Sequence, residues 1–376
     1  MTYFRFELLH TSKKSRARVG KIHTPHGVID TPNFVAVGTN GTLKALDNDM
    51  VQKIGLQLMF CNTYHLMLQP GTEVVRQAGG LHRFIHRDMP IITDSGGFQV
   101  FSLAYGSVAN ELKSKGIKKT DGMVLKISED GVLFRSYRDG SKMLLTPETS
   151  IQAQKDLGAD IIIPFDELPP YHIEKKLLIE SLERTHRWEE RSLKEHLKDP
   201  QQQAMYAVVH GGVDVELRAK SCSFLSKLPF DGFAIGGSLG KTKHELFELL
   251  DHTVVQLDAS KPNHLLGIGD LESIEQSIPK GIDTFDSSYP TRAARHGVAI
   301  TSQGPLNLTK GEYRNQFRPI DATCSCPTCA NFTLAYIHHL FKAKEMTALT
   351  LASVHNLHQM VEIMKAYRQK ILQDQI

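Results

Sequence analysis

The chain has 376 residues, of which 41% are hydrophobic and 23% are charged, and this composition excludes a disordered or fibrous protein. Its formal net charge of +3 permits a nucleic-acid partner but does not require one. Residues 1–18 are polar and basic, and no apolar run approaches the roughly 20 residues that span a membrane. We therefore expect a cytoplasmic protein with no signal peptide and no membrane partner.

Eight short apolar runs recur along the chain and are separated by segments with helical properties. They are nearly continuous in apolar residues, which is typical of parallel strands that are buried on both faces. The runs are 34–37, 58–61, 91–93, 161–165, 206–209, 232–235, 265–268 and 282–285.

Two of the intervening segments carry clear helix signals. Thr146 can cap a helix that begins at Pro147 and ends at Gly158, and Asp270 can cap another that ends before Pro279. Strands that alternate with helices imply right-handed crossovers and a parallel sheet. Eight such units favour closure of the sheet, so we predict an α/β fold, a (β/α)8 TIM barrel.

Polar residues and glycines follow most of the predicted strands. In a barrel all these strand ends lie on one rim, so Asp94, Asp166 and Asp286 are expected to converge there. Convergent carboxylates suit glycosyl transfer, in which one is the nucleophile and another shuttles the proton. A metal site made of these carboxylates is the alternative.

Two arginines stand close behind Asp286. Arg292 and Arg295 follow in a segment that contains Pro290. Guanidinium groups hold phosphates by bidentate hydrogen bonds, so the arrangement suits a nucleophilic carboxylate that acts on a phosphate-bearing substrate. The alternative is an aspartate that caps a helix, followed by ordinary surface arginines.

Residues 104–126 interrupt the strand and helix alternation. We expect an exposed basic insertion, which is either solvated or contacts a phosphate backbone. Its lysines include Lys113, Lys115, Lys118 and Lys119.

Three of the five cysteines, Cys324, Cys326 and Cys329, are clustered in sequence. In a cysteine-poor chain this cluster indicates a metal site in a reducing compartment, and a structural zinc needs a fourth ligand. A catalytic zinc is the weaker alternative, because the cluster lies outside the series of strand ends. The downstream candidates for the fourth ligand are His338, His339, His355 and His358.

The chain is expected to divide after the barrel. Residues 1–310 would form the barrel core with its basic insertion, and 311–376 a C-terminal zinc-binding subdomain. A basic amphipathic helix at 357–372, which either packs on the barrel or faces RNA, would close the chain.

Several motifs resemble one known family. They are NTYHL at 62–66, DSGGFQVFS at 94–102, FDE at 165–167, GG at 236–237, FD at 285–286, PTR at 290–292, and the cysteine cluster with His355. From Phe4 to Leu372 the chain resembles the tRNA-guanine transglycosylases, also called queuine tRNA-ribosyltransferases. The resemblance supports the barrel and the zinc subdomain, and it implies His355 as the fourth ligand.

The resemblance implies an exchange reaction on tRNA. The wobble guanine of tRNAs with GUN anticodons, those for Asn, Asp, His and Tyr, would be replaced by a 7-deazaguanine base. Asp286 matches the nucleophile that forms a covalent enzyme–tRNA intermediate, and Asp94 matches the general acid/base. A homodimer is also implied, in which one subunit catalyses while the other helps to hold the tRNA.

The other site residues are implied by position. Asp166 matches the carboxylate that binds the amino and ring-nitrogen edge of the purine, and Phe98 matches the ring that stacks on it. Gly237 matches the backbone donor to the purine oxygen. Arg292 and Arg295 match residues that hold the flanking anticodon nucleotides.

Some positions depart from the family pattern. His210 replaces a glutamine that contacts the purine oxygen, although imidazole can still donate there. Gly240 and Leu168 replace the Val and Cys of enzymes that use the small aminomethyl precursor. Because queuine carries a bulky cyclopentenediol, these two positions favour queuine as the incoming base. Ser238 also differs from the usual loop after Gly236.

Two alternatives stay open. The same reaction could use the aminomethyl precursor, or the chain could be a non-catalytic subunit of this fold that binds tRNA or a partner. Such a subunit would be expected to lose carboxylates from the rim, and all three are present. A relative that acts elsewhere in tRNA would be expected to carry a further RNA-binding domain after the zinc region, and none is visible before Ile376.

Overall fold

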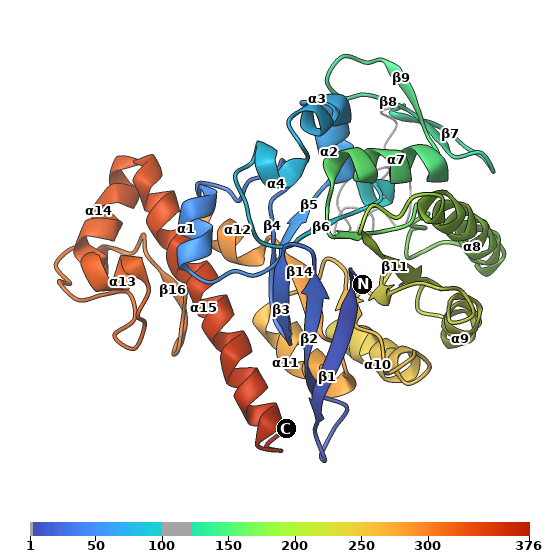
Figure 1. Cartoon of the computed structure of the whole chain (residues 1–376). Helices are drawn as coiled ribbons and strands as arrows, with labels where there is room; N and C mark the ends of the chain where they lie inside the picture. The colour runs from blue at the N-terminus through green and yellow to red at the C-terminus, as the bar shows by residue number, and fades with distance from the viewer. Residues whose placement is uncertain (1–2, 100–121) are drawn as a thin grey trace.

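The computed structural model describes residues 3–99 and 122–376. Within these residues eight parallel strands close into a barrel in the order β10-β11-β12-β13-β14-β4-β5-β6 (Figure 1). The strands are β4 (Asn33–Val37), β5 (Met59–Cys61), β6 (Ile91–Thr93), β10 (Ile161–Ile162), β11 (Ala204–Val209), β12 (Gly232–Ile235), β13 (Asn263–Leu265) and β14 (Thr284–Ser287). Each overlaps one of the eight apolar runs, so the predicted TIM barrel is confirmed.

The barrel strands are apolar on both faces because each face has its own packing partner. In β11, Tyr206 and Val208 pack inside the barrel with residues such as Ile92. Met205 and Ala207 point the other way and join the cluster beneath the surrounding helices. This alternation explains why the strands appear in the sequence as unbroken apolar runs.

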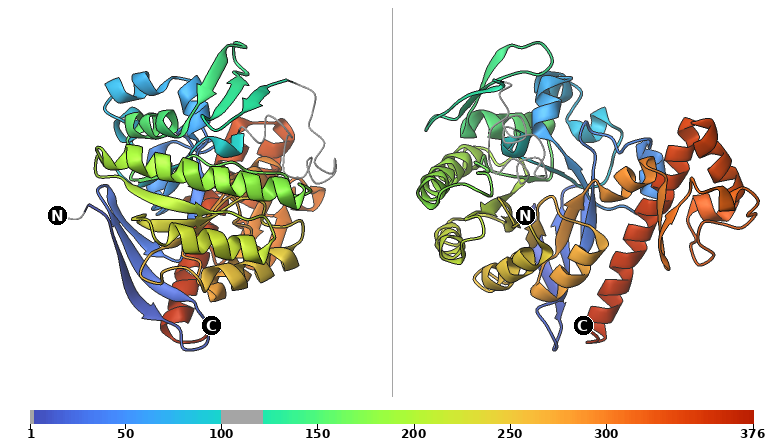
Figure 2. Two further views of the ribbon diagram at one scale, coloured as in Figure 1. Left: turned by 90° about the vertical axis from the view of Figure 1, so that its right-hand side faces the viewer. Right: turned by 180° about the vertical axis from the view of Figure 1, so that it is seen from behind.

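Helices surround the barrel, and the two that were predicted from capping residues are present. Thr146 caps α7 (Pro147–Leu157), which ends at Gly158 with φ +70°, and Asp270 caps α11 (Leu271–Ser277). Three helices lie side by side along one wall of the barrel (Figure 2). They are α8 (Lys175–Leu197), α9 (Val215–Leu225) and α10 (Lys243–Val254). Four short helices lie between β4 and β6 in the sequence. They are α1 (Asn48–Lys53), α2 (Thr63–Leu68), α3 (Thr72–Gln77) and α4 (Leu81–Phe84).

An antiparallel sheet that was not predicted precedes the barrel. It consists of β1 (Arg5–Thr11), β2 (Arg18–Thr24) and β3 (Gly27–Thr31). Ile22 and Ile29 of this sheet pack with the barrel interior, and Arg18 forms a buried bidentate pair with Asp283, at 2.9 and 2.6 Å, just before β14. The sheet therefore covers the N-terminal end of the barrel and leaves the C-terminal rim for a site.

A second antiparallel sheet follows β6 in the sequence. It contains β7 (Val124–Ile127), β8 (Val132–Arg135) and β9 (Lys142–Leu145). Of the predicted insertion 104–126, only 122–126 belong to the described residues, and β7 begins there. Lys113, Lys115, Lys118 and Lys119 lie outside the described residues.

The C-terminal segment builds a separate apolar cluster beside the barrel. This cluster contains Leu308, Ile320, Cys326 and Leu340. The elements that supply it are α12 (Tyr289–Arg295), β15 (Val298–Thr301), β16 (Gly304–Asn307), α13 (Pro327–Asn331), α14 (Leu334–Ala343) and α15 (Met346–Leu372). No helix among the described residues is long and apolar enough to cross a membrane.

The last helix, α15, begins at Met346, earlier than the predicted 357. It packs along β4 and α12, and the red ribbon in Figure 1 follows the side of the barrel. The Arg368 guanidinium donates to the Pro32 carbonyl at 2.6 Å. Of the two predictions for this helix, packing on the barrel is therefore confirmed.

Candidate functional site

Asp94 directly follows β6 and is held by three donors. Its Oδ2 accepts from Asn62 Nδ2 at 2.6 Å and from Gln99 Nε2 at 2.9 Å, and its Oδ1 accepts from the Thr63 N–H at 2.7 Å. Asn62 follows β5, the neighbouring strand, so barrel closure brings the donors together. The carboxylate is thus fixed in one orientation at the rim.

Burial raises the pKa of Asp94 to about 6, and the nearby charge of Asp166 adds to the effect. The hydrogen bonds from Asn62, Thr63 and Gln99 favour the ionised form and offset part of the rise. A carboxyl group with a pKa close to neutral pH can both give and take a proton during a reaction.

Asp166 follows β10 and also accepts on both oxygens. Ser95 Oγ donates to Oδ1 at 2.7 Å, and His210 Nε2 lies 2.9 Å from Oδ2. A Cβ on Gly97 would lie 2.6 Å from Oδ1 of Asp166, so the glycine is required for the chain to pass this close. Asp94, Asp166 and His210 therefore lie close together at the ends of three strands.

The glycine loop after β12 lies against this cluster. A Cβ on Gly237, which has φ +77°, would lie 2.8 Å from Nδ1 of His210. The buried guanidinium of Arg218 stabilises this loop, because it donates to the carbonyls of Gly236 at 2.9 Å and Ser238 at 3.2 Å. Arg218 was not singled out in the sequence.

Gly240 is constrained in a way that the sequence did not reveal. Its φ is +98°, and a Cβ there would lie 2.7 Å from Cβ of Glu245, in the first turn of α10. The absent side chain would thus point at the helix, so the expectation that its loss simply enlarges a base pocket needs correction. A valine at this position would strain the loop as well as occupy space.

Asp286 lies within β14 and is almost fully buried. Its Oδ1 accepts from the Gly267 N–H at 2.6 Å and lies 3.1 Å from His264 Nε2. The N-cap of the following helix α12 is Ser288. The alternative that Asp286 caps a helix is therefore wrong.

The remaining predicted residues lie on the same rim with different exposure. Phe98 is 48% exposed. Arg292 and Arg295 lie on α12 and are both exposed, and Arg295 Nε donates to the Thr291 carbonyl at 3.3 Å. Both guanidinium groups can therefore be reached by an anionic polymer.

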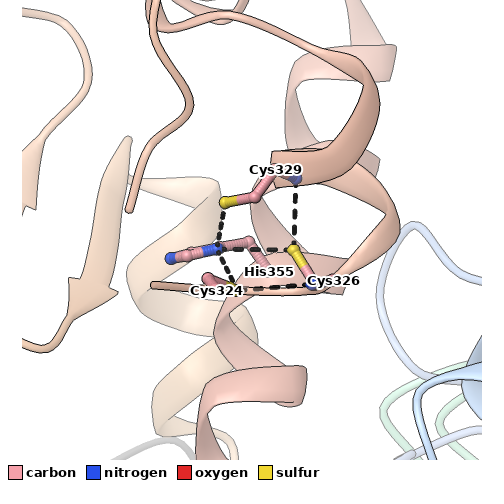
Figure 3. Close-up of side chains that lie close together, drawn as sticks. All are labelled: Cys324, Cys326, Cys329 and His355. Carbon is pink, nitrogen blue, oxygen red and sulfur yellow. Dashed lines mark hydrogen bonds between the residues drawn. The ribbon is translucent and has the colours of Figure 1, made fainter. Parts of the chain in front are cut away.

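The cysteine cluster meets His355 of α15 (Figure 3). His355 Nδ1 lies 3.6 Å from Sγ of Cys324, 3.6 Å from Sγ of Cys326 and 3.3 Å from Sγ of Cys329. A tetrahedral zinc with Zn–S of about 2.3 Å and Zn–N of about 2.0 Å separates S and N by roughly 3.5 Å. The cluster can thus hold a metal ion, and its dimensions fit zinc.

The orientation of His355 supports the same conclusion. Its other ring nitrogen, Nε2, lies 2.8 Å from the Ile300 carbonyl and donates to it, which directs Nδ1 toward the sulfurs, where it could act as a metal ligand. His338 Nδ1 lies instead 3.0 Å from the Leu308 carbonyl. Among the described residues, two groups have ligand atoms close enough to hold a metal, and His355 joins the three cysteines in one of them.

A second histidine group lies at the N-terminal end of the barrel. His26 Nδ1 and His82 Nε2 lie 2.8 and 3.1 Å from different oxygens of the buried Asp160. The two rings stack with centroids 3.5 Å apart and planes inclined by 11°. The lone pair of a ring nitrogen lies in the plane of its ring, so two stacked, parallel imidazoles cannot both direct a lone pair at one metal ion between them. The three residues therefore form a hydrogen-bonded link between the N-terminal sheet and the barrel.

Sequence analysis missed His264, the buried partner of Asp286. The predicted strand began at Leu265, whereas β13 begins at Asn263 and includes this histidine. A histidine inside a buried strand was the available signal, because such a side chain needs a polar partner.

Comparison with known proteins gives a consistent result. The model of the family described as queuine tRNA-ribosyltransferase matches residues 12–376. A queuine tRNA-ribosyltransferase of Protochlamydia amoebophila (strain UWE25) is 72% identical over 376 residues, which are 100% of this chain and 97% of the relative. Those of Chlamydia abortus (strain DSM 27085 / S26/3) and Chlamydia trachomatis serovar L2 (strain ATCC VR-902B / DSM 19102 / 434/Bu) are 57% and 55% identical over 373 residues, 99% of each chain.

Proposed function

The chain belongs to the queuine tRNA-ribosyltransferase family of enzymes, and we propose that it exchanges the wobble guanine of tRNAs with GUN anticodons for queuine. These are the tRNAs for Asn, Asp, His and Tyr. One observation carries the proposal: Asp94 follows β6 and Asp286 lies near the carboxyl end of β14, on one rim, and each is held by its own donors. A double displacement at a sugar needs two such carboxylates.

In the proposed reaction Asp286 attacks the anomeric carbon of the ribose. The bond from this carbon to guanine breaks, the carboxylate oxygen forms an ester-like bond to the sugar, and protonated Asp94 gives its proton to the departing base. The ionised Asp94 then takes a proton from the incoming base, whose nitrogen attacks the same carbon and releases Asp286. Two inversions retain the configuration, and no ATP is required because one glycosidic bond replaces another.

Three residues are proposed to recognise the base. Asp166 accepts from the amino group and the ring N–H, Phe98 stacks on the ring, and the backbone N–H of Gly237 donates to the purine oxygen. The exposure of Phe98 and the glycine floor at Gly97 and Gly237 support a flat ligand in this place.

A cavity beside this cluster supports an incoming base with a bulky arm. It has a volume of about 320 Å³, and its walls include Pro169, Tyr171, Leu178, Val213 and Ser238. These residues follow β10, β11 and β12 or begin α8, so the cavity opens at the same rim. We place the cyclopentenediol of queuine there, in preference to a space created at Gly240.

The zinc ion is proposed to be structural, with Cys324, Cys326, Cys329 and His355 as ligands. These residues would tie the loop around α13 to α15 through the ion, which would supply no chemistry to the reaction. On this basis we divide the chain into a barrel, 1–310, and a zinc-binding subdomain, 311–376.

Arg292 and Arg295 are proposed to hold the anticodon nucleotides next to the reacting one. Both are exposed on α12, immediately after the strand that bears the nucleophile. We further propose a cytoplasmic homodimer, in which one subunit catalyses and the other helps to hold the tRNA.

The test is the mass of a wobble-guanine tRNA after incubation with the enzyme and equal amounts of queuine and its aminomethyl precursor. We expect a mass gain that matches queuine. A gain that matches only the precursor would keep the exchange reaction and overturn the base preference. No gain with either base would favour the non-catalytic tRNA-binding subunit.

A further inference from the structure

His210 and Asp166 form a close pair between neighbouring barrel strands. Their side chains are 3% and 13% exposed, and Nε2 lies 2.9 Å from Oδ2. A carboxylate can only accept, so the ring Nε2–H is the donor. The Nε2–H of His210 therefore already donates to Asp166 and is not available to donate to a ligand.

The imidazole lies between Asp166 and the glycine loop. The backbone N–H of His210 donates to Ser221 Oγ at 3.2 Å, and the ring Nδ1 is buried without a hydrogen-bond partner among the described residues. Nδ1 faces Gly237, where an added Cβ would lie 2.8 Å away. Arg218 holds the loop that contains Gly237, so this loop closes one side of the imidazole, and Nε2 lies toward Asp166.

Two other acids lie near Asp166. Asp94 lies near enough for the charges to interact. Glu189 is fully buried and accepts from the Val208 N–H at 3.3 Å. Burial raises the pKa of Glu189 well above its usual value, and the charge of Asp166 raises it further. Donors on Asp166 decide which of its lone pairs remain for a ligand.

We infer that His210 is a positioning residue, which holds Asp166 oriented as the acceptor for the amino and ring-nitrogen edge of the base. Ser95 Oγ likewise donates a hydrogen bond to Oδ1 of Asp166, at 2.7 Å. Between them, the two donors fix the plane of the carboxylate, so that the remaining lone pairs of both oxygens point at the ligand. The inference rests on the proposed function, in which Asp166 recognises this edge.

The experiment compares guanine with hypoxanthine, which lacks the amino group that Asp166 would bind. For the full-length enzyme, the KM of guanine exchange into tRNA and the inhibition constant of hypoxanthine are measured. We expect His210→Leu to raise the KM for guanine about 10- to 100-fold. The inhibition constant of hypoxanthine should rise less, so the preference for guanine over hypoxanthine should shrink.

His210→Gln should restore most of that preference, because the amide group can still donate to Asp166. His196→Leu is the matched control, since this buried histidine of α8 also has an unpartnered Nδ1 among the described residues but lies away from the rim. It should reduce stability and leave the preference unchanged. If His210→Leu does not fold, His210→Asn replaces it, because its amide is too short to reach Asp166.

An unchanged preference in His210→Leu, or an equal loss in the Gln and Asn variants, would overturn the inference. A failure of the proposed function is distinguished by the unaltered enzyme, which would then exchange no guanine into tRNA.

Discussion

His264 Nε2 lies 3.1 Å from Oδ1 of Asp286, and the Nδ1 of the same ring lies 2.8 Å from Thr284 Oγ1. The imidazole is fully buried, so it supports the carboxylate from inside the barrel. The Gly267 N–H donates to the same oxygen. Among the described residues both hydrogen bonds reach Oδ1, which leaves Oδ2 available to attack a sugar.

Replacement of this nucleophile should stop the reaction at its first step. Asp286→Asn is expected to give no covalent adduct with tRNA on a denaturing gel, because an amide is a poor nucleophile. His264→Leu should form the adduct about 10- to 100-fold more slowly, since the carboxylate loses a donor that orients it. An adduct that persists in Asp286→Asn would place the nucleophile elsewhere.

The two halves of the exchange should depend on pH in opposite directions. Release of guanine needs protonated Asp94, whose pKa is about 6, so the rate of adduct formation should fall as the pH rises above 6. Capture of the incoming base needs ionised Asp94, so that rate should fall as the pH drops below 6. Single-turnover measurements of each half can separate the two. Asp94→Asn should abolish both dependences, and flat profiles in the unaltered enzyme would contradict the shuttle.

Elemental analysis should find one zinc per chain. Cys326→Ser is expected to lose the ion and to lower the melting temperature, because binding of a structural zinc contributes directly to folding. Cys222→Ala is the matched control, since this buried cysteine of α9 lies outside the cluster and should leave the zinc content unchanged. Purified protein without zinc would remove the metal from the proposal.

The buried pair of Arg18 and Asp283 should matter for stability and not for catalysis. Arg18→Ala is expected to cost about 3–5 kcal/mol in the free energy of unfolding, because Asp283 stays buried without its counter-charge. Arg5→Ala removes an exposed pair on the adjacent strand β1 and should cost only about 0–1 kcal/mol. Denaturant unfolding of both variants measures the difference. Equal effects would show that the N-terminal sheet is not anchored through Arg18.

The barrel was predictable because its strands obey a simple physical rule. A parallel strand that is buried on both faces must be apolar along its whole length, so eight such runs were visible without a structure. The topology rule then placed Asp94, Asp166 and Asp286 on one rim. The N-terminal sheet escaped prediction because its strands are antiparallel and partly exposed, with mixed polar and apolar residues.

The sequence by itself therefore determined the barrel, the order of the carboxylates around it and the cysteine cluster, because periodicity and spacing are local properties of the chain. Tertiary structure alone decided which side chains meet. The pairs His264–Asp286 and His210–Asp166, and the turn of Gly240 toward Glu245, depend on how separate strands and loops come together when the barrel closes. Closure brings these groups into contact, and spacing along the sequence does not encode distances between residues on separate strands.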